Sequence, residues 1–487
     1  MSTSGAPGPT ARSRRDRRDA LVDGRRDEHR NGRRSTRTIG ELDVVANRLP
    51  VAWTDGVGWE RAPGGLVTAL EAVVRRHRLR WFGAATAADG DHRPAWSHGP
   101  LVGVRVDPWI TDAAVTGMAN STLWPALHGI GERIRWRDSW WDGYVDYNRA
   151  FADEIVATAA RAASIWVHDY QLLLVPAMLA AQRPDLVVGL SIHTPVDEAL
   201  GRLPAGDAIT DALSAAAVIG VQTDRDRRTL RDLLPERGVS TASSRVPALP
   251  EVITSPVSID PDAALALLRD PATDAIAQRV RGRLEGRYLI VGIDRVDYTK
   301  AVEERLRGID LAFRRGHLDP DRVDIVQVAQ PTRHAVGGYA AHRVEVERLA
   351  HEVASQWTRR DGSAPLRLVP EGVDRRTVAA LLSEADLALV TPRRDGMNLV
   401  SKEFSIYNER HGGVLVLSEQ AGAAWELGEH SVLVDGSSPA SIADGIAEAM
   451  HLDHDRRREM ARGRAGAVRR WTVHDWAASF LRSLAAA

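Results

Sequence analysis

Short apolar runs alternate with amphipathic stretches along the chain from residue 41 onward. The runs LDVVANR, RWFGAATA, LVGVRVD, SIWVHDY, LVVGLSIH and AVIGVQT are continuously apolar, which predicts strands buried on both faces. Between them lie segments such as GGLVTALEAVVRRHR, whose apolar positions recur with helical spacing. This alternation predicts an α/β fold in which helices cover a parallel sheet.

A proline-rich passage at 246–261, VPALPEVITSPVSIDP, interrupts the pattern. The pattern then resumes with YLIVGIDRVD, RVDIVQVAQ, LRLVPEGV, ADLALVTP, GVLVLSE and SVLVDG. We therefore predict two Rossmann-like parallel-sheet domains, at 41–254 and 255–468. Ligands of such folds bind at the carboxyl ends of the strands, so the active site is expected in the cleft between the domains.

The two ends of the chain differ from this pattern. Residues 1–40 hold 11 arginines and 5 acidic residues with almost no large apolar side chain, so we predict a disordered Arg-rich tail. Residues 469–487 are predicted to form a helix that packs back on the first domain. Its apolar positions with helical spacing are Trp471, Trp476, Phe480 and Leu484.

Composition narrows the class of protein. The 64 basic residues nearly balance the 65 acidic ones, so no overall charge attracts nucleic acid or an anionic membrane. Cysteine is absent, which excludes a disulfide scaffold and thiolate chemistry. No apolar run approaches the ~18 residues of a membrane span, and the N-terminus lacks the apolar region of a signal peptide. We expect a cytoplasmic enzyme or binding protein with neither nucleic acid nor membrane as its partner.

Only two of the 64 basic residues are lysines. Lys300 follows the YLIVGIDRVD run and Lys402 follows ADLALVTP, so both are predicted at the ligand-binding edge of the second domain. A compact ammonium is not equivalent to the planar guanidinium of arginine. A lysine retained in so arginine-rich a chain therefore indicates a position that requires an ammonium. The alternative is that the two lysines survived by chance.

Two segments predict an anion site. Arg295 and Lys300 in GIDRVDYTK lie five residues apart across a strand-to-loop turn and can grip one diphosphate. In RRDGMNLVSKE, Gly396 permits a sharp turn, and a helix starting near Met397 directs free amides at an anion. Asp395 and Glu403 then accept hydrogen bonds from sugar and ribose hydroxyls, respectively.

These segments occur in order with ANRLP, APGGL, TLWP, VHDYQLLLVP, SIH, QPTR and GVLVLSEQAGAAWEL. Together they resemble the trehalose-6-phosphate synthases, retaining glycosyltransferases with two Rossmann domains (the B-type fold), over most of residues 41–485. The resemblance implies transfer of glucose from a nucleoside diphosphate glucose to glucose 6-phosphate, giving α,α-trehalose 6-phosphate. It implies no metal and no other cofactor. The one cluster of ligand-type residues, in HLDHDRRRE, is expected to be a solvated helix start.

The resemblance also implies roles for individual residues. The donor-binding residues are Gly64, Gly65, Arg295, Lys300, Asp395, Gly396, Met397, Asn398, Leu399, Val400 and Glu403. The acceptor-binding residues are Arg48, Trp124, Asp169 and Arg333. The residues at the reacting centre are Arg295, Lys300, Asp169, His193 and Asp395, with Asp169 orienting acceptor hydroxyls.

The sequence departs from the family at three places. Val115 stands where a tyrosine usually contacts the sugar phosphate. After His193 the family usually continues Ile-Pro-Phe-Pro, whereas this chain has TPVD, which adds the charge of Asp197. Ala301 replaces the glycine that usually follows the lysine. These departures leave two alternatives: a sister glycosyltransferase with a phosphorylated polyol or pseudosugar acceptor, and a catalytically weak sugar-nucleotide sensor. The donor base (UDP, GDP or ADP) and the oligomeric state, with a homo-oligomer as one possibility, stay open.

Overall fold

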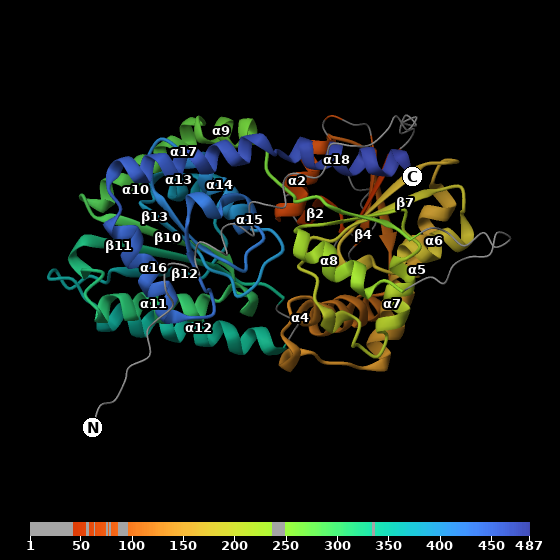
Figure 1. The fold of residues 1–487 in the computed structure, drawn as a ribbon, viewed down its shortest axis with the longest axis horizontal. Coiled ribbons are helices and arrows are strands. Elements are labelled where there is room, and N and C mark those ends of the chain that lie inside the picture. The colour runs from red at the N-terminus through yellow and green to blue at the C-terminus, as the bar shows by residue number, and fades with distance from the viewer. Residues whose placement is uncertain are drawn as a thin grey trace, which may run out of the picture. The chain divides into compact units, whose positions relative to one another are not determined.

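The computed structural model describes residues 42–54, 58–62, 64–74, 76, 79–85, 96–235, 249–333 and 337–487. The predicted tail, 1–40, lies outside them. Two parallel sheets with helices on both faces make up most of the described part, which confirms the predicted α/β class (Figure 1). A small antiparallel hairpin, β2 (Val51–Thr54) and β3 (Gly58–Arg61), follows the first strand. None of the described helices is long and apolar enough to cross a membrane.

The first sheet has the strand order β5-β4-β1-β6-β7-β8-β9. Each apolar run predicted in this half became a strand. The strands are β1 (Leu42–Arg48), β4 (Leu79–Ala85), β5 (Leu101–Arg105), β6 (Ser164–His168), β7 (Val187–Ser191), β8 (Val218–Val221) and β9 (Glu251–Thr254). All neighbours pair in parallel; in the centre, Val44 pairs with Trp81 on one side and with Trp166 on the other.

Strand β9 was not predicted, because it lies inside the proline-rich passage. Pro250 immediately precedes it, and β9 is one of the two edge strands of the sheet. An edge strand tolerates proline at its start, since one side of its backbone needs no partner strand. The linker at 255–260 follows directly and leads to α9 (Pro261–Leu268).

The second sheet has the strand order β12-β11-β10-β13-β14-β15. Its strands are β10 (Tyr288–Arg295), β11 (Val323–Gln330), β12 (Leu366–Val369), β13 (Leu387–Val390), β14 (Val414–Ser418) and β15 (Val432–Val434). One face is covered by α11 (Val302–Arg314), α12 (Gly337–Gln356) and α16 (Pro439–His451). The other is covered by α10 (Pro271–Leu284), α13 (Arg375–Glu384), α14 (Leu399–Tyr407) and α17 (His454–Arg470) (Figure 1).

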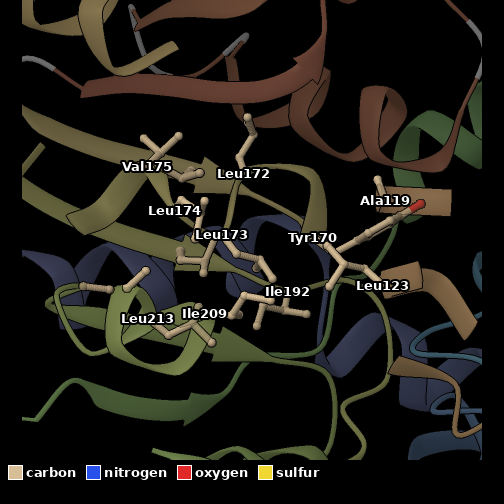
Figure 2. Close-up of a cluster of buried hydrophobic side chains, with 14 of the residues drawn as sticks. Ala119, Leu123, Tyr170, Leu172, Leu173, Leu174, Val175, Ile192, Ile209 and Leu213 are labelled. Atoms are coloured by element: carbon tan, nitrogen blue, oxygen red, sulfur yellow. The ribbon is translucent and has the colours of Figure 1, made fainter. Parts of the chain in front are cut away.

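The core of the first sheet has two sides. On one side, η3 (Asp112–Leu123), α4 (Trp124–Leu127), α5 (Asp138–Thr158), α6 (Val175–Gln182) and α7 (Gly206–Leu213) cover the strands. Figure 2 shows part of this core, where the run 172–175 packs near Ile192, Ile209 and Leu213. Tyr170 closes the same cluster next to Ala119 and Leu123 (Figure 2).

On the other side of the first sheet lie α2 (Gly65–Val74) and the terminal helix α18 (Val473–Ala486). The rings of Trp166 and Phe480 stack with centroids 4.8 Å apart. Phe480 also fills the space over Gly189, where a Cβ atom would lie 2.7 Å from its ring. The terminal helix α18 is therefore part of the first sheet's core, whereas the preceding helix, α17, packs on the second sheet.

Candidate active site

The end of strand β10 forms the centre of the candidate site. After Arg295 the chain turns into η7 (Tyr298–Lys300), a single 3₁₀ turn that Asp297 caps by accepting a hydrogen bond of 3.0 Å from the Thr299 amide. This turn directs the Lys300 ammonium to Asp395, with Nζ 2.5 Å from Oδ2. Both side chains are about nine-tenths buried, at 10% exposure each. Burial alone would raise the pKa of Asp395, but Lys300 holds that pKa below its usual range.

The segment after β13 provides the facing wall. Asn398 caps α14 by accepting a hydrogen bond from the Ser401 amide at 3.1 Å, so the helix begins at Leu399, two residues later than expected. A Cβ atom on Gly396 would lie 2.1 Å from the His193 carbonyl oxygen. Gly396 does not have a positive φ, so this glycine is required for close approach and not for a turn. It brings the segment against the first sheet.

Trp124, Asp297 and Arg333 join the two sheets at the site. The Asp297 carboxylate accepts a hydrogen bond from Trp124 Nε1 at 3.4 Å and pairs with Arg333. The Arg333 guanidinium lies over the Trp124 ring, with Cζ 3.8 Å from the centroid, and donates to Tyr170 Oη at 3.1 Å. Burial would raise the pKa of Asp297, but Arg333 and Arg295 keep it well below its usual range. The carboxylate therefore stays charged and holds the Arg333 guanidinium in place, with Arg295 close enough to act on it electrostatically.

Arg295 is the exposed cation of this group. Its Cζ lies 6.0 Å from the Trp124 centroid, at the far end of the range for a cation–π contact. Arg333, in contrast, is 9% exposed and has φ of 52°, a left-handed conformation that is uncommon for a side-chain-bearing residue. The contacts of the Arg333 side chain with Asp297, Tyr170 and Trp124 hold the residue in that conformation.

His193 and Asp169 come from the first sheet. Asp169 has φ of 74° and accepts a hydrogen bond of 3.1 Å from the His193 amide. The strained backbone turns its carboxylate toward the next strand end. The ring of His193 stacks on His168, and His168 Nδ1 lies 3.1 Å from His193 Nε2. Burial lowers the pKa of His193, which keeps the ring neutral near pH ~7.

A cavity of about 210 Å³ lies beside Glu403. Its walls come from both halves of the chain and include Gly65, Ser258, Arg375, Leu399, Glu403 and His474. Burial raises the pKa of Glu403 to about 7, an effect that Arg375 opposes. A carboxyl group with a pKa near 7 can accept hydrogen bonds and, when protonated, donate one. It therefore suits contact with hydroxyl groups, which is the ribose-binding role expected for Glu403.

The other predicted residues lie around this cavity and the strand ends. The Cβ position of Gly65, the first residue of α2, lies 3.0 Å from Leu399, so the start of α2 faces the start of α14. Gly64 has φ of 140°. Met397 and Leu399 pack against the cores of both sheets, and Val400 packs on the second alone. Arg48 is exposed at the carboxyl end of β1.

The departures from the family have structural explanations. Asp197 pairs with Arg394 at 2.6 Å, and Arg394 also donates to the Val196 carbonyl at 2.7 Å. The added charge is therefore neutralised by a residue from the loop after β13. Val115 packs against the core of the first sheet. Ala301 has φ of 53°, so the left-handed turn usually made by glycine is retained.

Lys402 is engaged by the linker and by Glu426, neither of which is a predicted donor-binding residue. Its Nζ is completely buried and donates to the Val257 carbonyl at 2.9 Å and to both Glu426 oxygens at 2.8 and 3.1 Å. Val257 belongs to the linker at 255–260. Lys402 therefore ties the helix that carries Glu403 to the linker between the sheets.

Sequence reasoning missed three residues of this site. Tyr170 and Tyr339 both hydrogen bond to Arg333, at 3.1 and 2.7 Å. His128 stacks on Trp124 with ring centroids 4.2 Å apart. Tyr170 directly follows Asp169, and His128 comes four residues after Trp124. Their closeness in sequence to these predicted site residues could have identified them.

Metal-type side chains are not clustered in the described part of the chain. No group of three or more His, Asp or Glu side chains there is arranged to hold a metal ion. In the HLDHDRRRE segment, Asp453 caps α17 by accepting a hydrogen bond of 2.8 Å from the Arg456 amide. This confirms that the segment is a helix start.

Known proteins share this architecture and sequence. The profile of Glycosyltransferase family 20 matches residues 40–486. A trehalose-6-phosphate synthase of Mycobacterium marinum is 35% identical, covering 93% of this chain and 95% of the relative. An α,α-trehalose-phosphate synthase (UDP-forming) of Burkholderia xenovorans, solved in complex with glucose-6-phosphate, is 26% identical with a TM-score of 0.82, covering 91% of this chain and all of that one. Its counterpart from Burkholderia vietnamiensis is 29% identical with a TM-score of 0.80, covering 92% and 99%. With nearly its whole length matched, the chain belongs to glycosyltransferase family 20.

Proposed function

We propose that this protein is a trehalose-6-phosphate synthase, which transfers glucose from a nucleoside diphosphate glucose to glucose 6-phosphate with retention of configuration. The observation that carries the proposal is the convergence of Arg295, Lys300 and Arg333 at neighbouring strand ends, around Asp297 and Trp124. Two arginines beside one aromatic ring, with Lys300 near the same Asp297 carboxylate, suit a nucleoside diphosphate sugar and a sugar phosphate. The similarity to trehalose-6-phosphate synthases along nearly the whole chain supports the same function.

On the donor side, Arg295 and Lys300 stabilise the leaving nucleoside diphosphate. As the glycosidic bond breaks, negative charge builds on the phosphate oxygen, and a fixed cation in a largely buried site lowers the free energy of that state. Lys300 is paired with Asp395 beforehand, so donor binding exchanges this partner for the diphosphate. Asp395 is then available to accept a hydrogen bond from a hydroxyl of the transferred glucose.

On the acceptor side, Arg333 and Arg48 hold the phosphate of glucose 6-phosphate. Asp169, with its carboxylate fixed by the His193 amide, orients the acceptor hydroxyls. The neutral ring of His193 contacts the transferred glucose. The leaving phosphate oxygen takes the proton of the attacking hydroxyl on the same face of the sugar, so no carboxylate nucleophile is assigned. Arg295 and Lys300 take the place of a divalent cation on the diphosphate.

A second candidate is a sister enzyme with another phosphorylated acceptor. Val115 favours it, because an apolar side chain packed on the core provides no hydroxyl for the sugar phosphate. Loss of one hydrogen bond to a charged group costs about 1.5 to 3 kcal/mol, roughly tenfold to a hundredfold in affinity. The acceptor site is thus weaker for glucose 6-phosphate unless another residue compensates.

Nucleotide release from the purified protein tests the proposal. UDP-, GDP- and ADP-glucose are each supplied with and without glucose 6-phosphate, and the product is identified by mass and NMR. Release that depends on the acceptor and yields an α,α-1,1-linked disaccharide phosphate is expected, and it identifies the donor base. Donor binding without that product contradicts the proposal and directs the search to other phosphorylated polyols.

A further inference from the structure

His128 is a buried histidine between the donor and acceptor residues. It follows α4 and is only 4% exposed. Its ring lies against Trp124, with centroids 4.2 Å apart, and its electrostatic neighbours are Asp297, Asp395 and Lys300. It thus lies against Trp124 on the acceptor side and within electrostatic range of the Lys300–Asp395 pair on the donor side.

A single contact fixes the tautomer of His128. The ring Nδ1 lies 2.7 Å from the Trp124 carbonyl oxygen, which also accepts the His128 amide at 3.2 Å. A carbonyl oxygen only accepts hydrogen bonds, so Nδ1 must carry the hydrogen. Burial lowers the pKa of His128 to about 4, so the ring is neutral near pH ~7. Nε2 therefore presents a lone pair.

That lone pair has no donor among the described residues. No described side chain or amide donates a hydrogen bond to Nε2, and the atom remains accessible to solvent. The nearby cations are already engaged, since Lys300 pairs with Asp395 and Arg333 pairs with Asp297. A fixed acceptor atom in a nearly buried position, with no donor of its own, is suited to a ligand hydroxyl.

We propose that His128 Nε2 accepts a hydrogen bond from a hydroxyl group of the acceptor sugar, which makes His128 a substrate-binding residue. This inference rests on the proposed function, because it assigns one more contact within the same site. The ring lies against Trp124 on the acceptor side, which favours the acceptor sugar over the donor. With its low pKa, the imidazole holds the hydroxyl in place and does not remove its proton at neutral pH.

Two amide substitutions separate the ring nitrogens. In His128→Asn the side-chain NH₂ can reproduce Nδ1–H, but no atom reaches the position of Nε2. In His128→Gln the amide oxygen reaches that position and can accept the same hydrogen bond. We expect the glucose 6-phosphate KM to rise about tenfold in His128→Asn, the effect of losing one hydrogen bond to a buried partner, with most of it recovered in His128→Gln. The donor KM should change less than about twofold in both.

The controls identify a merely structural role. His351→Asn, on the exposed surface of α12, should match the wild type. Thermal unfolding and calorimetric donor binding are measured for every variant. An unchanged acceptor KM in His128→Asn overturns the inference, as does an equal loss in both variants together with weaker donor binding. Calorimetric binding of glucose 6-phosphate is measured alongside turnover. If the wild type binds glucose 6-phosphate without transfer, the proposed function fails. The affinities of the His128 variants for glucose 6-phosphate still test the proposed hydrogen bond in that case.

Discussion

The Lys300 ammonium and the Asp395 carboxylate are 2.5 Å apart, joining the end of β10 to the loop after β13. Each therefore neutralises the other's charge in the absence of substrate. Donor binding has to separate them, since the diphosphate competes for the cation and a sugar hydroxyl competes for the anion. The contribution of Lys300 to donor binding therefore depends on Asp395, and that of Asp395 on Lys300.

Lys300→Ala should reduce kcat/KM about a hundredfold to a thousandfold, as expected when a group that stabilises the leaving charge is removed. Arg295→Ala should lower it in the same direction, by less because Arg295 is exposed. Steady-state kinetics with saturating acceptor measures both. Arg314→Ala, an exposed residue of α11 paired with Asp310, is the control. Near-normal kcat/KM in both site variants would remove the diphosphate role.

Arg333→Ala should raise the glucose 6-phosphate KM about tenfold or more while changing the donor KM much less. The reason is that Arg333 lies on Trp124, the ring assigned to the acceptor side, whereas Lys300 and Asp395 are assigned to the donor. Arg343→Ala, an exposed residue of α12 paired with Glu347, provides the comparison. An unchanged acceptor KM in Arg333→Ala would take this arginine out of the acceptor site.

The sequence predicted the parts of this structure that depend on local patterns. The apolar runs became strands, and the DRVDYTK and DGMNLVSKE segments lie at strand ends of the second sheet. Contacts between distant residues were not predictable from such patterns. Asp197 and Arg394 are 197 residues apart, and nothing near either one specifies the other. Strand β9 was missed because its signal, four residues beside two prolines, resembles a loop.

Lys402→Arg should destabilise the fold by about 1 to 3 kcal/mol, because a larger, planar group has to fit a completely buried space built around an ammonium. Urea unfolding measures this, and kinetics shows whether the donor KM also rises as the linker moves. Lys402→Met should cost more, about 3 to 5 kcal/mol, by leaving Glu426 without its cation. Wild-type stability and kinetics in Lys402→Arg would mean that this lysine survived by chance.

Glu403 should make stability fall as pH rises. Its pKa in the folded state is raised from 4.5 to about 7, so between these values the folded protein keeps a proton that the unfolded chain has released. The contribution is present at low pH and is lost as pH rises through about 7, amounting to about 2.5 kcal/mol between about pH 5 and about pH 8. Urea unfolding of the wild type and Glu403→Gln at both pH values isolates it. Equal pH dependence in the two proteins would refute the raised pKa.

Ala301→Gly should stabilise the protein. Ala301 caps α11 with φ of 53° and ψ of 40°, a conformation that costs a residue with a Cβ atom about 1 to 2 kcal/mol and costs glycine almost nothing. Glycine loses about 0.4 to 1 kcal/mol of that gain through the greater freedom of the unfolded chain, so a net stabilisation of about 0.5 to 1 kcal/mol is expected. Urea unfolding measures it, and Ala312→Gly, in the interior of α11 with an ordinary helical conformation, should be destabilised instead. A loss of stability in Ala301→Gly would show that the methyl group's packing in this fully buried position outweighs the backbone strain.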